Sequence, residues 1–390
     1  HFRSSPVYLS DINSGFEDEN GNRIFLDEGR ILRKEFGSNC TFLGLDQTVV
    51  PRAFSSITGP VYLRPGFSLL LYAIEYTKIL NAISKADKEY CFFAIPDASL
   101  ALDSSLFLDW IDRELEIYRF KAYSMSDLQF VGMPAGELGK RILNQVGTSV
   151  PTGSADKEFI ESLGGKMIVW NNVKNTVQGS KPNVFGYNGD SIITLVPQPL
   201  EEPVDNGQTY LVDGWFSNTS TSMFAMISSY PQFRNLLEKA GMYDPQSYGF
   251  PFLTEGSAYT IFMPSASALT NYGADTLSVE ELKAFLRYHF VRGERIYTDN
   301  KKLWGEYETM RRDESSTAYN TYYSTLNIRP GRDVIEILDE EGEIYTSVNE
   351  GSGANKFIYY DTDKSPESTS SGDLIITAVL HEIDTVLIKH

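Results

Sequence analysis

The chain has 390 residues, which is enough for two or three domains that each bury a core of their own. Its formal net charge of −18 argues against nucleic acid and anionic membrane surfaces, because both require clustered Lys and Arg. No apolar run approaches the roughly 20 residues that span a bilayer. Aromatic residues make up 13% of the chain, which suits strand-rich cores and exposed contact surfaces.

The first half of the chain predicts interleaved helices and strands. The phrase over residues 59–67 is strand-like, and Ser68 is placed to cap a helix over residues 69–80. Residues 91–95 predict a buried strand that Pro96 ends. Further helices are expected over 106–118 and 135–145, and further strands over 166–170, 191–196 and 208–212.

The second half predicts its elements more clearly. An amphipathic helix is expected over residues 231–240. Ser278 and Glu281 form a capping box that starts a helix running to Tyr288. Strands are expected over 259–263, 334–338, 344–345, 374–379 and 383–388. Because helices and strands alternate without a regular β-α-β-α spacing, the predicted fold class is α+β.

Two phrases occur twice and in the same order, which indicates a tandem array of one domain type. The phrase over residues 59–67 recurs over residues 207–216, and the phrase over residues 92–100 recurs over residues 261–269. This organisation is typical of a modular binding protein. The chain lacks the Gly-x-Ser-x-Gly, His-Glu-x-x-His and P-loop patterns that would indicate a catalytic centre.

Neither the cysteines nor the acidic loops indicate a metal site. Cys40 and Cys91 form no Cys-x-x-Cys motif, and each precedes an apolar strand-like run. We expect two buried thiols that act as small hydrophobic groups, with a disulfide as the alternative. The acidic loops over residues 17–21 and 361–363 do not match the spacing of calcium ligands, so we interpret them as solvated turns.

The remaining titratable candidates also have structural interpretations. Asp213 and Asp384 occupy matching places in the two predicted closing strands. We expect them to accept backbone hydrogen bonds, because a catalytic residue need not occur once in every module. The internal histidines, His289 and His381, have no metal-like spacing to a cysteine, so no zinc site is predicted.

The second half resembles a fasciclin-like (FAS1) domain through a series of motifs in the family's order. These are residues 233–242, 259–265, 286–293, 325–326 and 379–387. Residues 66–216 resemble a second, more divergent copy, in which Asn144-Gln145 stands where the family has Tyr-His. We therefore predict one domain over residues 66–216 and another over residues 217–390. Residues 1–65 are interpreted as a strand-rich N-terminal segment from an incomplete copy.

The resemblance implies that each domain is a β-wedge or sandwich with a layer of short helices. It implies a non-enzymatic adhesion or interaction protein that binds an extracellular protein or glycan, without catalytic residues or cofactors. It also implies an extracellular or cell-surface location, which in a bacterium would be the outer membrane, as a lipoprotein anchored outside this chain, or the periplasm. A glycan-processing or glycan-capture accessory of an uptake system and a structural spacer are the alternatives.

Five side chains are candidates for ligand contact: Tyr288, His289, Tyr319, Tyr322 and Tyr323. In the resembled family the Tyr-His pair lies near surfaces discussed for adhesion. The alternative is that this pair packs inward at a helix-to-strand junction. The other three tyrosines lie among Ser, Thr, Asn and Arg, a composition that suits paratope-like surfaces or sugar stacking. Their alternative is burial along a strand.

Overall fold

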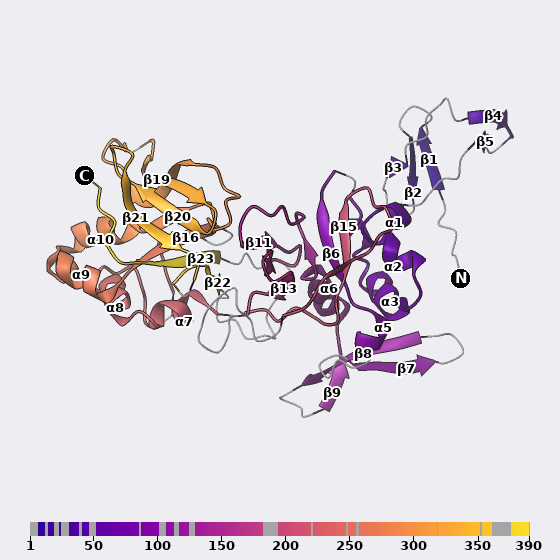
Figure 1. Ribbon diagram of the computed structural model, residues 1–390, viewed down its shortest axis with the longest axis horizontal. Coiled ribbons are helices and arrows are strands. Elements are labelled where there is room, and N and C mark those ends of the chain that lie inside the picture. The colour runs from indigo at the N-terminus through magenta and orange to yellow at the C-terminus, as the bar shows by residue number, and fades with distance from the viewer. Residues whose placement is uncertain are drawn as a thin grey trace. The chain divides into compact units, whose positions relative to one another are not determined.

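The chain forms two compact units in the computed structural model, and each is considered by itself (Figure 1). The first unit comprises residues 1–150, 160–166 and 195–215, and the second comprises residues 151–159, 167–194 and 216–390. The structure describes residues 7–11, 15–18, 23–24, 31–38, 41–46, 52–85, 87–100, 107–112, 117–124, 129–181, 194–219, 221–246, 249–254, 257–317, 319–351, 353–360 and 376–389. Within these ranges, no helix is long and apolar enough to cross a membrane.

The first unit begins with two small antiparallel sheets and two short helices. One sheet contains β1 (Val7–Asp11), β2 (Gly15–Asp18) and β3 (Arg23–Ile24), and the other contains β4 (Ile31–Phe36) and β5 (Thr41–Leu45). The helices are α1 (Arg52–Ser55) and α2 (Gly59–Leu63). The predicted strand over residues 59–67 is therefore wrong. Pro60 fits the first turn of a helix, and a side chain at Gly59 would meet the backbone of Phe54.

The core of the first unit is a four-stranded sheet in the order β10-β6-β15-β14. Its strands are β6 (Tyr90–Ala94), β10 (Val146–Gly147), β14 (Gln198–Pro199) and β15 (Gly207–Leu211). Its helices are α3 (Ser68–Thr77), α4 (Leu80–Ile83), α5 (Asp97–Leu100) and α6 (Ala135–Leu143). Strand β6 is buried along its whole length, as predicted, and it contains Cys91. Cys40 lies outside the described residues.

Two further sequence predictions in the first unit are corrected. Ser68 does not cap α3; the carboxylate of Asp97 instead accepts hydrogen bonds from the backbone N–H groups of Ser68 (3.0 Å) and Leu69 (2.9 Å). The helix expected over residues 106–118 is also wrong, because β7 (Phe107–Asp112) and β8 (Ile117–Ser124) pair here as antiparallel strands, and β9 (Gln129–Gly132) joins β8. The aromatic and β-branched content of this stretch favours strands.

The second unit contains a layer of helices against an eight-stranded sheet (Figure 1). The helices are α7 (Met223–Ser228), α8 (Pro231–Lys239), α9 (Ala266–Tyr272) and α10 (Val279–Tyr288), with a 3-10 turn at Ala274–Thr276. The sheet order is β21-β20-β19-β18-β17-β16-β23-β22. Its strands are β16 (Ala258–Pro264), β17 (Phe290–Arg292), β18 (Gly305–Arg312), β19 (Tyr323–Gly331), β20 (Val334–Leu338), β21 (Ile344–Asn349), β22 (Lys356–Tyr360) and β23 (Ile376–Ile383).

Most sequence predictions for the second unit are confirmed. Helix α8 buries Phe233, Leu236 and Leu237, and the capping box of Ser278 with Glu281 starts α10. The two strands expected over residues 374–379 and 383–388 are instead one strand, β23. Residues 384–389 leave the sheet even though Val386 and Leu387 are buried. The backbone N–H of Leu387 donates to the ring of His289 rather than to a neighbouring strand.

A second, three-stranded sheet contains β11 (Lys157–Glu161), β12 (Met167–Asn171) and β13 (Thr176–Gly179). Three of its side chains pack in one apolar cluster with residues of the second unit; the cluster consists of Phe159, Met167, Val169, Tyr297, Phe357 and Val379. Phe159 stacks on Tyr297 with ring centres 5.0 Å apart. The core of the second unit therefore includes residues from well before α7 in the chain.

Each unit contains the same strand arrangement around its central strand. Strand β6 pairs antiparallel with β10 and parallel with β15, just as β16 pairs antiparallel with β17 and parallel with β23. In both, the central strand donates a backbone hydrogen bond to the residue just before its antiparallel neighbour: Phe93 N–H donates to the Gln145 carbonyl and Phe262 N–H donates to the His289 carbonyl, each at 2.9 Å. Gln145 therefore occupies in the first unit the position of His289 in the second.

Candidate functional site

The Tyr-His pair lies inside the second unit, where α10 meets β17. Tyr288 is 7% exposed, and its hydroxyl donates to the carbonyl of Thr325 at 3.0 Å. His289 is fully buried. Its Nδ1 lies 2.9 Å from the carbonyl of Phe285, and its Nε2 lies 3.0 Å from the backbone N–H of Leu387. A ligand at the surface of this conformation does not reach the imidazole.

The hydrogen bonds of His289 define its protonation state. Nε2 must be an unprotonated acceptor because Leu387 N–H is a donor, so Nδ1–H donates to Phe285. Burial lowers the pKa of His289 to about 4, although the bond to Phe285 acts in the opposite direction. A proton on Nε2 would point at Leu387 N–H. The pair at this junction therefore connects α10 to the segment that follows β23.

His381 has a similar internal role on β23. It is fully buried, its Nδ1 accepts from Asn355 N–H at 3.2 Å, and its Nε2 lies 2.9 Å from the Ile296 carbonyl. Burial lowers its pKa to about 4. Both ring nitrogens of each internal histidine thus serve backbone groups, an arrangement that stabilises the fold and leaves neither imidazole for ligand chemistry at neutral pH.

The other three candidates lie at one end of the β18–β19 hairpin. Tyr319 is 97% exposed and Tyr322 is 52% exposed, in contrast to burial along a strand. Tyr323 begins β19 and is only partly exposed, because the guanidinium of Arg292 lies over its ring at 4.0 Å. We call residues 313–317 and 319–322 the tyrosine loop. The structure brings these three tyrosines together and places the Tyr-His pair elsewhere, in the core.

The tyrosine loop is ordered by its own hydrogen bonds. Asp313 N–H donates to the Tyr322 carbonyl at 2.9 Å, which closes the base of the loop. The Ser316 hydroxyl donates to the same carbonyl and accepts from Tyr322 N–H, both at 2.9 Å. Farther out, Thr317 N–H donates to the Asn320 carbonyl at 2.8 Å. The exposed rings of Tyr319 and Tyr322 are therefore carried by a backbone with a defined conformation.

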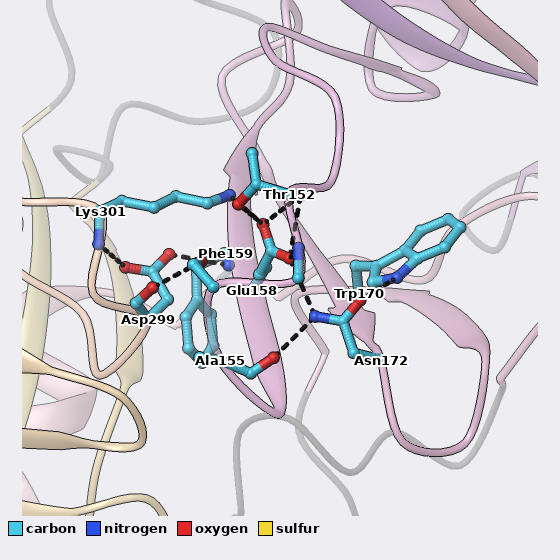
Figure 2. A network of polar contacts seen from close by, with 10 residues as sticks. Thr152, Ala155, Glu158, Phe159, Trp170, Asn172, Asp299 and Lys301 are labelled. Carbon is cyan, nitrogen blue, oxygen red and sulfur yellow. Dashed lines mark hydrogen bonds and ion pairs between the residues drawn. The ribbon is translucent and has the colours of Figure 1, made fainter.

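The second unit also contains a buried network of charged and polar groups. Figure 2 shows Glu158 at the centre of this network. The fully buried carboxylate of Glu158 accepts from Thr152 N–H at 2.9 Å and from the Asn172 amide at 2.9 Å, and it pairs with the Lys301 ammonium at 3.0 Å. Burial raises the pKa of Glu158, but the bonds from Asn172 and Thr152 and the charge of Lys301 outweigh it and lower the pKa to about 2.

Asp299 completes this network. It is 1% exposed and accepts from Phe159 N–H at 3.1 Å and from Lys301 N–H at 3.2 Å (Figure 2). Burial raises its pKa against the attraction of Lys301. Among the described residues, backbone and side-chain groups of the second unit donate to Glu158 and Asp299, so the cluster anchors residues 152–159. Within the described residues, no group of His, Cys, Asp and Glu side chains is arranged to hold a metal ion.

Sequence reasoning missed this network. Glu158 and Asp299 stand 141 positions apart, and neither lies in a motif that predicts their contact. The Asp213 and Asp384 pair gave a stronger sequence signal, yet both are exposed. The Thr346 hydroxyl donates to Asp384 at 3.5 Å. The acidic stretch over residues 361–363 and residues 19–21 of the other acidic loop lie outside the described residues.

One family model matches part of the chain. Residues 228–341 match the model of the fasciclin domain. No curated protein matched the chain. A solved FAS1 domain pair from the insect cell adhesion molecule fasciclin I is similar over 83% of this chain and 97% of that chain, with 10% sequence identity and a TM-score of 0.26. This TM-score is too low to support conclusions about the arrangement of the units.

The chain therefore has an α+β fold, and residues 228–341 of its second unit are similar to the fasciclin domain. Fasciclin domains are associated with cell adhesion and are generally non-catalytic.

Proposed function

We propose that this protein is a non-enzymatic extracellular interaction protein, and that the tyrosine loop of its second unit contacts a protein or glycan ligand. The observation that carries the proposal is the 97% exposure of Tyr319 on a loop whose backbone is internally hydrogen-bonded. A large ring of this kind supplies contact area at a low cost in side-chain entropy. The fasciclin domain that carries the loop belongs to a family associated with adhesion.

The order of the tyrosine loop supports a binding role over a solvated turn. Binding costs free energy wherever a flexible segment must be fixed, and a loop that is already fixed avoids that cost. The side chains around Tyr319 and Tyr322 are Ser, Thr, Asn and Arg, which can add hydrogen bonds to a contact made by the rings. Such a surface suits a polar partner such as a glycan or the hydrophilic face of a protein.

We also propose that the first unit is a divergent fasciclin copy. Its central strand has the same neighbours, in the same directions, as β16 of the second unit, and Gln145 makes the backbone bond that His289 makes there. The boundaries proposed for the copies are residues 66–216 and 217–390, with residues 1–65 as a partial copy. We further propose that the protein lies at the cell surface or in the periplasm, as a lipoprotein whose anchor lies outside this chain.

The test is binding of the full chain to arrays of glycans and extracellular-matrix proteins at physiological salt. We expect saturable binding that Tyr319→Ala and Tyr322→Ala each weaken roughly fivefold or more, which corresponds to about 1 kcal/mol at a contact residue. Leu303→Ala is the matched control, because Leu303 is 84% exposed and precedes β18 at the end opposite the loop.

Unchanged binding in both tyrosine variants would remove the loop as the contact surface. Absence of binding by the wild-type chain would favour the structural spacer. The variant Tyr319→Phe distinguishes the type of contact, because it keeps the ring and removes the hydroxyl. A glycan or protein that stacks on the ring alone tolerates this change.

A further inference from the structure

One carboxylate organises the base of the tyrosine loop. Asp313 Oδ1 accepts from Ser315 N–H at 3.0 Å and from the Ser315 hydroxyl at 2.7 Å. The carbonyl of Asp313 accepts from Ser316 N–H at 3.1 Å, and its N–H donates to Tyr322. Ser316 in turn makes both bonds to the backbone of Tyr322. The conformation of the loop therefore depends on where the Asp313 side chain is held.

The group that holds Asp313 comes from the far end of the second unit in sequence. The ammonium of Lys389 lies 2.6 Å from Asp313 Oδ2, and 76 positions separate the two residues. The pair is only partly solvated, because the side chain of Asp313 is 24% exposed and that of Lys389 is 34% exposed. Hydrogen bonds from Lys389 and then from Ser315 hold the pKa of Asp313 well below its usual range.

The segment that carries Lys389 is itself fixed. Residues 384–389 follow β23, and Leu387 is 1% exposed, with its N–H bonded to His289. Lys389 is thus presented from a backbone that the core holds in place, two residues beyond a buried side chain. Lys389 therefore places a positive charge in a fixed position at the base of the tyrosine loop. From Asp313, hydrogen bonds through Ser316 continue to the backbone of Tyr322.

We propose that Lys389 is the positioning residue of the tyrosine loop, and that its ion pair with Asp313 keeps the loop in the conformation that contacts a ligand. Without the ammonium, Asp313 Oδ2 keeps only the longer contact with the Ser324 hydroxyl (3.5 Å), and the bonds at Ser315 and Ser316 hold the loop less firmly. The consequence for binding rests on the function proposed above. The consequence for loop order does not depend on any ligand.

The test is amide hydrogen exchange of the full chain, measured peptide by peptide. We expect Lys389→Ala to speed exchange over residues 313–322 by roughly three- to tenfold, since a partly exposed ion pair with a charged hydrogen bond contributes about that factor to local order. Lys389→Arg keeps the charge and is expected to restore protection. The control is Lys283→Ala, because Lys283 pairs with Glu280 on the exposed side of α10.

Salt supplies a readout that a purely packing role would not change. Raising NaCl from about 0.05 M to about 0.5 M screens a partly exposed pair, so exchange in the loop should rise in the wild type and not in Lys389→Ala. Equal protection of the loop in wild type and Lys389→Ala would overturn the proposal. Faster exchange throughout the second unit would also overturn it, because Lys389 would then support the whole fold.

The array experiment separates this inference from the proposed function. Loss of loop protection in Lys389→Ala together with weaker binding of the array ligand supports both. Loss of protection with unchanged binding retains Lys389 as the residue that orders the loop but shows that the ligand contacts another surface, which overturns the binding half of the proposal.

Discussion

The two units place different side chains at the same helix-to-strand junction. In each, a buried polar residue ends the helix before the second strand of the core: Gln145 in the first unit and His289 in the second. The amide of Gln145 lies 3.3 Å from the Phe93 carbonyl and 3.4 Å from the Gly214 carbonyl. The imidazole of His289 makes one bond as a donor and one as an acceptor.

The two side chains have the same structural role but respond differently to pH. Both residues connect the helix end to the chain that follows the closing strand, so the position needs a polar group that reaches the backbone on two sides. The amide of Gln145 does not titrate, so its hydrogen bonds do not depend on pH. The imidazole of His289 can accept the Leu387 hydrogen bond only while it is neutral. The buried histidine therefore gives the second unit a sensitivity to acid that the same position in the first unit lacks.

The largest expected effect is acid destabilisation of the second unit. Burial lowers the pKa values of His289 and His381 to about 4 in the folded chain, from the ordinary histidine value of 6.5. Because the unfolded chain binds these protons first, stability is complete above pH 6.5 and falls as the pH approaches 4. The loss at pH 4 is roughly 3 kcal/mol for each histidine. Urea denaturation at pH 7.5, 6.5, 5.5 and 4.5, followed by hydrogen exchange of each unit, measures it.

The acid-induced loss of stability should also begin in the second unit. Peptides of the second unit should lose protection as the pH falls from 6.5 to 4.5, ahead of those from the core of the first unit. The depressed pKa of Glu158 cannot imitate this, because the stability it contributes is lost only below pH 4.5, as the pH falls through about 2. Parallel loss in both units over this window would contradict the assignment to the histidines.

The next effect tests whether residues before the fasciclin match belong to the core of the second unit. Phe159 is 4% exposed, stacks on Tyr297 and meets the edge of Phe357 with ring centres 5.9 Å apart. Phe159→Ala should destabilise the second unit by about 3–5 kcal/mol, from lost burial and the cavity left behind. Thermal or urea unfolding of the full chain measures this loss.

A matched control uses the same substitution where the ring is solvated. Phe36→Ala removes a phenyl group that is 72% exposed on β4, so its effect should remain within about 0.5 kcal/mol. If the two variants were equally stable, Phe159 would not belong to the core of the second unit. A fragment that begins at residue 217 lacks Phe159 and Glu158, and we expect it to be less stable than the second unit in the full chain.

The sequence predicted those elements whose signals are local. The capping box at Ser278 and the apolar face of α8 depend on residues three or four positions apart, and both were predicted correctly. The phrase over residues 59–67 was misread because Gly and Pro suit a turn, a strand end or a first helical turn, and only packing against Phe54 distinguishes them. The contact between Glu158 and Lys301 has no local signal at all.

The candidate site was predictable only in part. The composition of the 307–323 stretch pointed to Tyr319 and Tyr322, but could not decide between a buried strand and an exposed loop. Hydrogen bonds within the loop decide it, and they depend on the position of Asp313 relative to Lys389. For His289, the sequence left both a surface role and inward packing open, and the acceptor role toward Leu387 could be seen only once the chain after β23 was placed.

The smallest effect is expected from the substitution His289→Gln. It places in the second unit the residue type that the first unit has at the equivalent position, Gln145. The amide can accept from Leu387 N–H through its oxygen and donate to Phe285 through its nitrogen, so the fold should remain. We expect a cost of about 1–2 kcal/mol at pH 7.5, from imperfect geometry at a buried hydrogen-bonded site. The loss of stability between pH 6.5 and 4.5 should be roughly halved, since only His381 then titrates within the core.

His289→Leu is the control for this exchange. It keeps a buried side chain of similar volume and leaves Leu387 N–H and the Phe285 carbonyl without their partner, so it should cost more at pH 7.5 than the glutamine does. The pH dependence should fall equally in both variants, because neither side chain titrates. If His289→Gln kept the wild-type dependence on pH, the acid sensitivity would lie outside this junction, and the difference between Gln145 and His289 would be one of packing alone.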